Sequence, residues 1–241
     1  MSMGNKTPQN HLTAEENVCW ACHHPRGTGH LCRYCSVLQP LLNSENRFSV
    51  MGLSPRLNLD FSSLQRTFYE LSRNYHPDFY QTRTSEEKSI SEAATAMINT
   101  AYETLNDPIR RVEYLLTLEG MPAERGESKP PMDLFEEILS MQETLSDYRE
   151  AKLNKTANLD LAQAAVLKTN EDLESRQKGL AKRLEALSLR WDALLDSSST
   201  IHKPDSEEKK KILTELRDTL GEIAYLRTVL RDIQKTIETR S

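Results

Sequence analysis

The four cysteines of the chain stand in two pairs with the spacing of metal ligands. Cys19 and Cys22 form one CxxC pair, Cys32 and Cys35 form the other, and nine residues separate the pairs. A CxxC turn aims two thiolates at one point, so two such turns complete the tetrahedral shell of four sulfurs that zinc favours. That shell leaves no position open for water or substrate. The cysteines therefore predict one structural zinc ion rather than a catalytic metal.

Three other interpretations of the cysteines stay open at this point. Paired disulfides are typical of secreted proteins. A redox-active CxxC normally lies beside a βαβ unit, which the sequence does not contain. For the zinc interpretation, the nine-residue spacer is shorter than the roughly 15 to 20 residues of the commonest double-CxxC pattern. Three neighbouring histidines, His23, His24 and His30, are alternative metal ligands.

A second constellation is the triplet His76, Pro77 and Asp78, which combines an imidazole, a rigid ring and a carboxylate. The residues before it predict a helix, because apolar positions recur at steps of three and four and Asp60 can cap the first turn. These positions are Phe61, Leu64, Phe68, Leu71 and Tyr75. The residue before a proline is pushed out of the helical region, so the triplet is expected at the helix exit. A plain turn, with Asp78 as a cap, is the alternative.

The next apolar run predicts a helix that packs antiparallel to the first. Its residues are Ile90, Ala94, Met97, Ile98, Ala101, Tyr102 and Leu105. The triplet then lies in the exposed loop of a helical hairpin. Asp107 and Pro108 indicate the start of a further helix, and Gly120 indicates its end. The apolar side of that helix is Ile109, Val112, Leu115 and Leu116.

The last 110 residues predict three long amphipathic helices, from Met132 to about Leu153, from about Leu159 to Leu195, and from about Ser206 to Thr239. Two of them carry clear seams. The seams are Leu173, Leu180, Leu184, Leu187, Trp191 and Leu194, and then Leu213, Leu216, Leu220, Ile223, Leu230 and Ile237. Because each helix must bury its stripe against another, an antiparallel three-helix bundle is expected.

The expected architecture is all-α, with a helical hairpin, a three-helix bundle and a small zinc module. We expect the zinc module in residues 1–46, the hairpin domain in 47–120, a Pro- and Gly-bearing linker in 121–131, and the bundle in 132–241.

Composition excludes several classes of function. The net charge is −5, and residues 1–46 carry three Lys or Arg against three Glu, so no basic face for nucleic acid is expected. No apolar run approaches the roughly 18 residues that cross a bilayer. The sequence has no HExxH helix, phosphate-binding glycine loop or Ser/His/Asp constellation, so we do not expect an enzyme.

The middle of the chain resembles a J-domain, because His76, Pro77 and Asp78 stand between two antiparallel amphipathic helices. A second motif is similar to the signature of the HscB-type J-domain co-chaperones. It consists of Ala101, Tyr102, Glu103, Thr104, Leu105, Pro108, Arg110, Glu113, Tyr114, Leu115 and Leu116. An N-terminal double-CxxC module resembles the zinc-bearing branch of that family. A general DnaJ-type protein would carry a Gly/Phe-rich segment, which this chain lacks.

The resemblance implies a co-chaperone that acts in iron-sulfur cluster assembly. Its hairpin would stimulate ATP hydrolysis by a DnaK- or HscA-type heat-shock chaperone. The residues implied for that contact are His76, Pro77, Asp78, Arg66, Arg73 and Asn74. Phe79 stands where many general J-domains have a Lys.

The resemblance also implies that the C-terminal bundle binds the iron-sulfur scaffold protein IscU. The implied contact residues are Leu134, Phe135, Ile138, Leu139, Glu143 and Tyr225. Apolar residues lie on two sides of the first helix, which exceeds the single stripe that a bundle buries. One side is therefore a candidate docking surface, and plain core is the alternative.

The resemblance leaves the compartment and the assembly state open. We expect the cytoplasm in a bacterium or the mitochondrial matrix in a eukaryote; residues 1–18 resemble neither a secretory signal nor a transit peptide. A homo-oligomer stays open, and no membrane or nucleic-acid partner is expected. The alternative function is a zinc-containing nucleic-acid or ribosome adaptor in which the J-like fold is incidental.

Overall fold

The computed structural model describes residues 18–42, 46–121, 132–154, 158–197 and 206–238. Within these ranges the regular elements are helices, with two isolated β-bridges near the cysteines, so the all-α prediction is confirmed. The chain divides into two compact units, Met1–Ser54 with Asp60–Asn106, and Pro55–Leu59 with Asp107–Ser241. The boundaries of the four domains expected from sequence differ from the boundaries of these two units, and the four domains stay a prediction. None of the described helices is long and apolar enough to cross a membrane.

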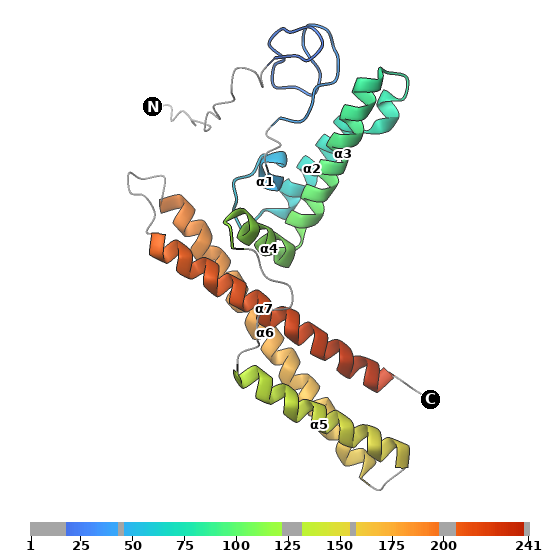
Figure 1. Cartoon of the computed structure of the whole chain (residues 1–241), viewed down its shortest axis with the longest axis vertical. Coiled ribbons are helices and arrows are strands. Elements are labelled where there is room, and N and C mark those ends of the chain that lie inside the picture. The colour runs from blue at the N-terminus through green and yellow to red at the C-terminus, as the bar shows by residue number, and fades with distance from the viewer. Residues whose placement is uncertain (1–17, 43–45, 122–131, 155–157, 198–205, 239–241) are drawn as a thin grey trace. The chain divides into compact units, whose positions relative to one another are not determined.

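The first unit is built on the helical hairpin of α2 (Phe61–Tyr75) and α3 (Ser85–Asn106) (Figure 1). Asp60 caps α2, because its carboxylate accepts a hydrogen bond of 3.0 Å from the N–H of Ser62. A 3₁₀ helix, η1 (Pro77–Tyr80), lies in the connection between the two helices. The hairpin core consists of Leu64, Tyr75, Ala94, Ile98, Ala101 and Leu105.

Two details of the hairpin differ from the sequence expectation. Phe61 and Met97 belong to the apolar runs but are exposed, because both lie at the border of the buried stripe: Phe61 opens α2, and Met97 precedes the fully buried Ile98. The short helices α1 (Arg47–Val50) and η1 were not predicted. Four residues make about one turn, which is too short to give a hydrophobic period.

The second unit contains α4 (Pro108–Leu118), α5 (Met132–Asn154), α6 (Leu159–Ser197) and α7 (Ser206–Glu238). Helix α6 packs against both α5 and α7, which confirms the three-helix bundle (Figure 1). Its 39 residues give a helix of about 58 Å. The buried seam includes Leu173, Leu180, Leu184, Leu187, Trp191, Leu213, Leu216 and Leu220.

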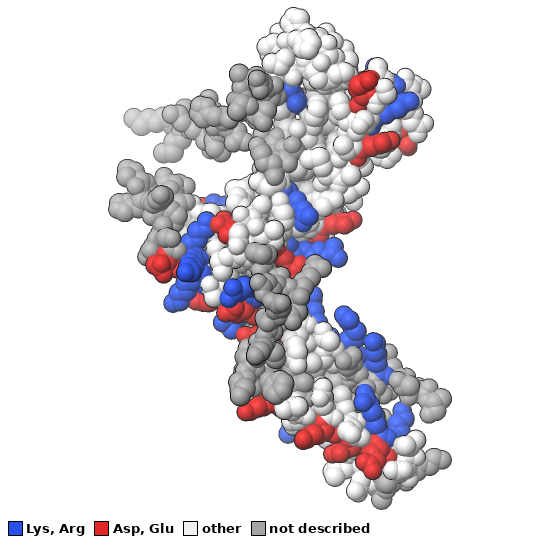
Figure 2. Space-filling model, viewed as in Figure 1, with Lys and Arg blue, Asp and Glu red and all other residues white. Residues whose placement is uncertain are grey.

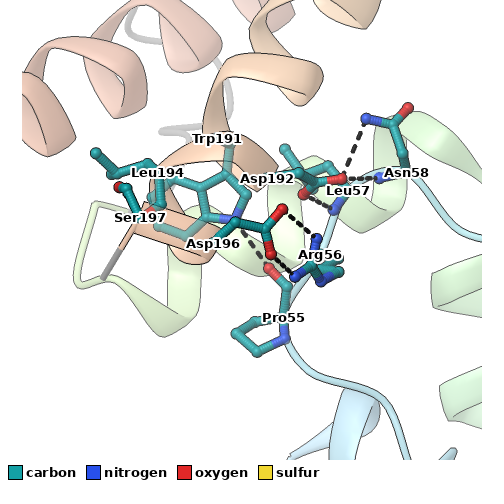
Figure 3. Close-up of polar contacts among 9 residues, drawn as sticks. All are labelled: Pro55, Arg56, Leu57, Asn58, Trp191, Asp192, Leu194, Asp196 and Ser197. Carbon is teal, nitrogen blue, oxygen red and sulfur yellow. Dashed lines mark hydrogen bonds and ion pairs between the residues drawn. The ribbon is translucent and has the colours of Figure 1, made fainter. Parts of the chain in front are cut away.

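The C-terminal part of α6 holds a strap, which we define as residues Pro55–Leu59 (Figure 3). The buried carboxylate of Asp192 accepts hydrogen bonds from the backbone N–H groups of Leu57 at 2.8 Å and Asn58 at 2.9 Å. The indole N–H of Trp191 donates to the carbonyl of Pro55 at 2.8 Å. Arg111 of α4 donates to the carbonyl of Leu57. The C-terminal part of α6 therefore provides the platform for this strap.

We predict that Asp192→Ala lowers the free energy of unfolding by about 2 kcal/mol, because it leaves the buried N–H of Leu57 and the partly buried N–H of Asn58 without an acceptor. Asp196→Ala is the matched control, since Asp196 pairs with Arg56 at an exposed position and such pairs add little stability. Urea unfolding of both variants checks the prediction. Equal stability of the two variants would contradict it.

Candidate functional site

The two CxxC pairs lie in two turns with the same backbone geometry. An isolated bridge closes each turn, Val18 with Pro25 and Leu31 with Leu38. In each turn the first cysteine donates its N–H to the carbonyl five residues later, at 2.8 Å for Cys19 and 3.0 Å for Cys32. The residues after the second cysteines, His23 and Ser36, both have φ of 57°. The repeated geometry turns both pairs of thiols toward one centre.

The four sulfur atoms lie within 4.8 Å of one another. The Sγ atoms of Cys19 and Cys35 are 3.6 Å apart, and those of Cys22 and Cys32 are 3.7 Å apart. Four sulfurs at the usual Zn–S bond length of about 2.3 Å have edges of about 3.8 Å. The cysteines are free thiols, since a disulfide needs sulfurs about 2.05 Å apart. The cluster therefore fits a tetrahedral metal ion, and the nearby histidines do not belong to it.

Hydrogen bonds to the sulfurs favour thiolates. The N–H groups of Ala21 and Tyr34 each lie 3.4 Å from the sulfur two residues earlier, and the amide of Gln39 donates to the Cys19 sulfur at 3.3 Å. Burial alone raises the pKa of Cys19, but donation from the backbone of Cys22 and Ala21 outweighs it and lowers the pKa to about 6.

Cys35 behaves in the opposite way. The backbone N–H of Val37 lowers its pKa, but burial and the neighbouring thiols outweigh this and raise it to about 12. Four thiolates so close together repel one another, so they cannot all be charged without a cation. A dication in the cluster removes that repulsion, which matches the chemistry of this donor set.

The His76–Asp78 triplet lies at the exit of α2, where His76 ends the helix in an extended conformation. The N–H of Asp78 donates to the Nδ1 of His76 at 3.2 Å, and the Asp78 carboxylate lies 3.6 Å from the same nitrogen. The side chains of His76 and Asp78 are 51% and 71% exposed. Phe79, which follows them, is exposed as well. The turn thus presents an imidazole, a carboxylate and an aromatic ring to solvent.

Side-chain hydrogen bonds fix the backbone just before the triplet. The hydroxyls of Ser91 and Thr95 donate to the carbonyl of Tyr75, at 2.6 Å and 3.0 Å. The hydroxyl of Tyr80 donates to the carbonyl of Asn74 at 2.7 Å. These contacts satisfy carbonyls that the end of α2 leaves without helical partners. The three hydroxyl residues were missed in the sequence, because their partners are backbone carbonyls 6, 16 and 20 residues away, and no residue type marks a carbonyl as an acceptor.

The other residues predicted for the chaperone contact lie on α2. The side chains of Arg66 and Arg73 are exposed, and Asn74 is partly buried. All three precede the triplet on the same helix. A cationic side chain remains in water here and is available to an acidic partner.

The predicted scaffold contact lies on α5 and α7 and is described only in part. Leu139 is 47% exposed and Glu143 is exposed, whereas Tyr225 packs partly against the core of the unit. Met141 and Leu145 of the opposite side of α5 are buried. The side chains of Leu134, Phe135 and Ile138 lie outside the described part of the chain.

Comparison with known proteins identifies the family. The DnaJ domain family matches residues 46–114. The co-chaperone protein HscB homolog of Vibrio parahaemolyticus is 36% identical over 118 residues, which span 48% of this chain and 68% of that protein. The chain belongs to the HscB family of co-chaperones. The mouse iron-sulfur cluster co-chaperone protein HscB is 28% identical over 204 residues, 83% of this chain and 76% of that protein.

The solved structures agree with this assignment at the level of the fold. The crystal structure of human co-chaperone protein HscB superposes with a TM-score of 0.63 at 24% identity, covering 92% of this chain and 100% of that chain. The resemblance to HscB-type proteins with a DnaJ domain is therefore confirmed. The residues assigned to chaperone and scaffold contacts in this HscB relative stay predictions.

Proposed function

We propose that this protein acts in iron-sulfur cluster assembly, where it delivers an IscU-type scaffold protein to a DnaK- or HscA-type heat-shock chaperone and stimulates ATP hydrolysis by that chaperone. Family membership and the exposed triplet at the exit of α2 support the proposal. The hydrolysis itself belongs to the partner. The hairpin acts by binding one conformation of the chaperone more tightly than another, which shifts its population toward hydrolysis.

The single observation that carries the chaperone contact is the exposure of His76 and Asp78 on a turn that follows two carbonyls held by side-chain hydrogen bonds. A preorganised turn loses little conformational entropy when it binds. Arg66 and Arg73 on the preceding helix add positive charge that would meet an acidic surface of the chaperone.

The scaffold contact is proposed on the exposed side of α5, with Leu139 at its centre and Glu143 and Tyr225 beside it. Buried Met141 and Leu145 already supply the stripe that the bundle needs. Leu139 stays exposed although the helix already buries an apolar stripe, and a contiguous apolar patch around it would be typical of a docking surface.

We predict that Leu139→Ala weakens binding of the IscU-type scaffold about tenfold, because truncating a central apolar contact costs roughly 1 to 2 kcal/mol. Leu153→Ala is the matched control, since Leu153 is 83% exposed on the same helix. Isothermal titration with the scaffold measures both affinities, and circular dichroism checks that helicity is retained. Equal affinity of the two variants would remove Leu139 from the contact.

The proposal includes one structural zinc ion on the four thiolates. It places the protein in the bacterial cytoplasm or in the mitochondrial matrix. It favours protein partners over nucleic acid, because both signs of charge are interspersed on the described part of the face in Figure 2. Affinity capture from the source organism tests the choice of partner. Recovery of the scaffold with a heat-shock ATPase supports the proposal, and recovery of RNA or ribosomes supports an adaptor function instead.

A further inference from the structure

A buried carboxylate connects the four-cysteine module to the hairpin of the first unit. The N–H of Leu38, next to the second cysteine turn, donates to Oε1 of Glu87 on α3 at 3.2 Å. Leu38 is fully buried and Glu87 is only 3% exposed. A carboxylate is costly to bury unless hydrogen-bond donors surround it, so the module is part of what holds Glu87 in place.

The other carboxylate oxygen of Glu87 fixes the C-terminal end of the loop between α2 and α3, which carries the triplet. Oε2 accepts from the N–H of Thr84 at 3.4 Å and from its hydroxyl at 3.3 Å, and the N–H of Glu87 donates back to that hydroxyl at 3.2 Å. This reciprocal pair is a capping box at the start of α3. Residues 76–84 therefore end at a cap whose carboxylate also faces the cysteine module.

The module also contacts the other end of the same connection. The rings of His30 and Tyr75 lie edge to face with centroids 6.2 Å apart. Burial raises the pKa of Tyr75 to about 12, and the positive charge of buried Arg26 acts against that rise. Tyr75 directly precedes His76, so module residues border the turn at both of its ends.

The metal cluster lies within a few residues of these contacts. Leu38 forms the bridge that closes the turn of Cys32 and Cys35. Gln39, the next residue, donates its side-chain amide to the Cys19 sulfur and its backbone N–H to the carbonyl of His30 at 2.8 Å. The position of the Leu38 N–H is thus set by the folding of the cysteine turns, which a bound metal would stabilise.

We propose that Glu87 is a positioning residue through which metal occupancy of the four-cysteine cluster sets the order of the His76–Asp78 turn. The loaded module supplies the Leu38 donor and excludes water from Glu87, which keeps the Thr84 cap closed. The stripped module withdraws that donor and loosens the turn. The effect on a chaperone ATPase rests on the function proposed above, but the effect on the turn does not.

Hydrogen exchange of the full chain, zinc-loaded and metal-stripped, tests this link without any partner. In the unchanged protein, stripping is expected to raise exchange of the amides of residues 79–87 about tenfold, as expected for the loss of about one hydrogen bond. Glu87→Gln loses one acceptor, so its turn is expected to exchange fast in both metal states. Glu92→Gln, at an exposed position of the same helix, is the matched control and should respond as the unchanged protein does.

Two outcomes would overturn the proposal. One is a turn whose exchange in the unchanged protein does not depend on metal. The other is a Glu87→Gln variant with the full response to metal. Thr84→Ala gives a second variant that keeps the Leu38 contact but loses the hydroxyl of the cap; a full metal response there would also contradict the proposal. If the exchange results hold but ATPase stimulation does not depend on metal, Glu87 has the proposed role in the turn, and the order of the turn does not control stimulation; the chaperone assignment itself is tested separately at His76.

Discussion

Replacing His76 with glutamine is expected to abolish stimulation of the cognate chaperone ATPase. The His76 side chain is about half exposed at the helix exit and makes its close contacts within the turn, so its loss leaves the hairpin core intact. Removing a side chain at the centre of an interface costs about 2 kcal/mol or more, which lowers stimulation more than about 30-fold at limiting concentration. Steady-state ATPase assays with the purified chaperone measure this.

The control for this experiment is Glu92→Gln, which introduces the same side chain at an exposed position of α3. Both variants should keep the circular dichroism spectrum and unfolding midpoint of the unchanged protein. If His76→Gln stimulated hydrolysis as well as Glu92→Gln, the triplet would not be the chaperone contact.

Metal removal is expected to unfold residues 18–42 and leave the helices of both units formed. The module contains two tight turns and no regular helix, so bound metal must supply much of its stability, and structural zinc in small peptides contributes about 10 to 16 kcal/mol. Loaded protein should contain one zinc ion per chain and four thiols that react slowly with a thiol reagent. Stripped protein, and the Cys32→Ser variant, should expose reactive thiols.

His24→Ala separates the sulfur ligands from the neighbouring histidines. His24 Nδ1 lies 2.9 Å from the carbonyl of Cys22, which makes it the histidine most closely tied to the cluster. We expect this variant to keep one zinc ion per chain, as measured by elemental analysis. Loss of the ion would place a histidine among the ligands, and thiols that react rapidly in loaded protein would rule out a four-thiolate site.

The long helices could be predicted from sequence because their signals are local. Asp60, Asp107 and Gly120 mark helix ends through the geometry of a single turn, and the structure confirms all three positions. The CxxC spacing predicted the cysteine cluster for the same reason. The apolar seams of α6 and α7 also follow directly from their period.

The strap and the Glu87 contact could not be predicted in this way. Asp192 accepts from Leu57, 135 residues away, and Glu87 accepts from Leu38, 49 residues away. A carboxylate on a helix is usually exposed, and nothing local distinguishes these two from their neighbours. The scaffold patch could be predicted only in part. The apolar period of α5 identifies the side that packs in the core, but it does not show what binds the other side.

The strap ties the stability of an N-terminal segment to residues near the C-terminus of α6. The second unit includes Pro55–Leu59, which lie between α1 and α2, and then all residues from Asp107 onward. The polypeptide therefore passes between the units three times. A fragment cut to the family boundaries of 46–114 would carry Pro55–Leu59 without the Asp192 carboxylate and Trp191 indole that satisfy it. Such a fragment is therefore expected to be less stable than the same residues in the full chain.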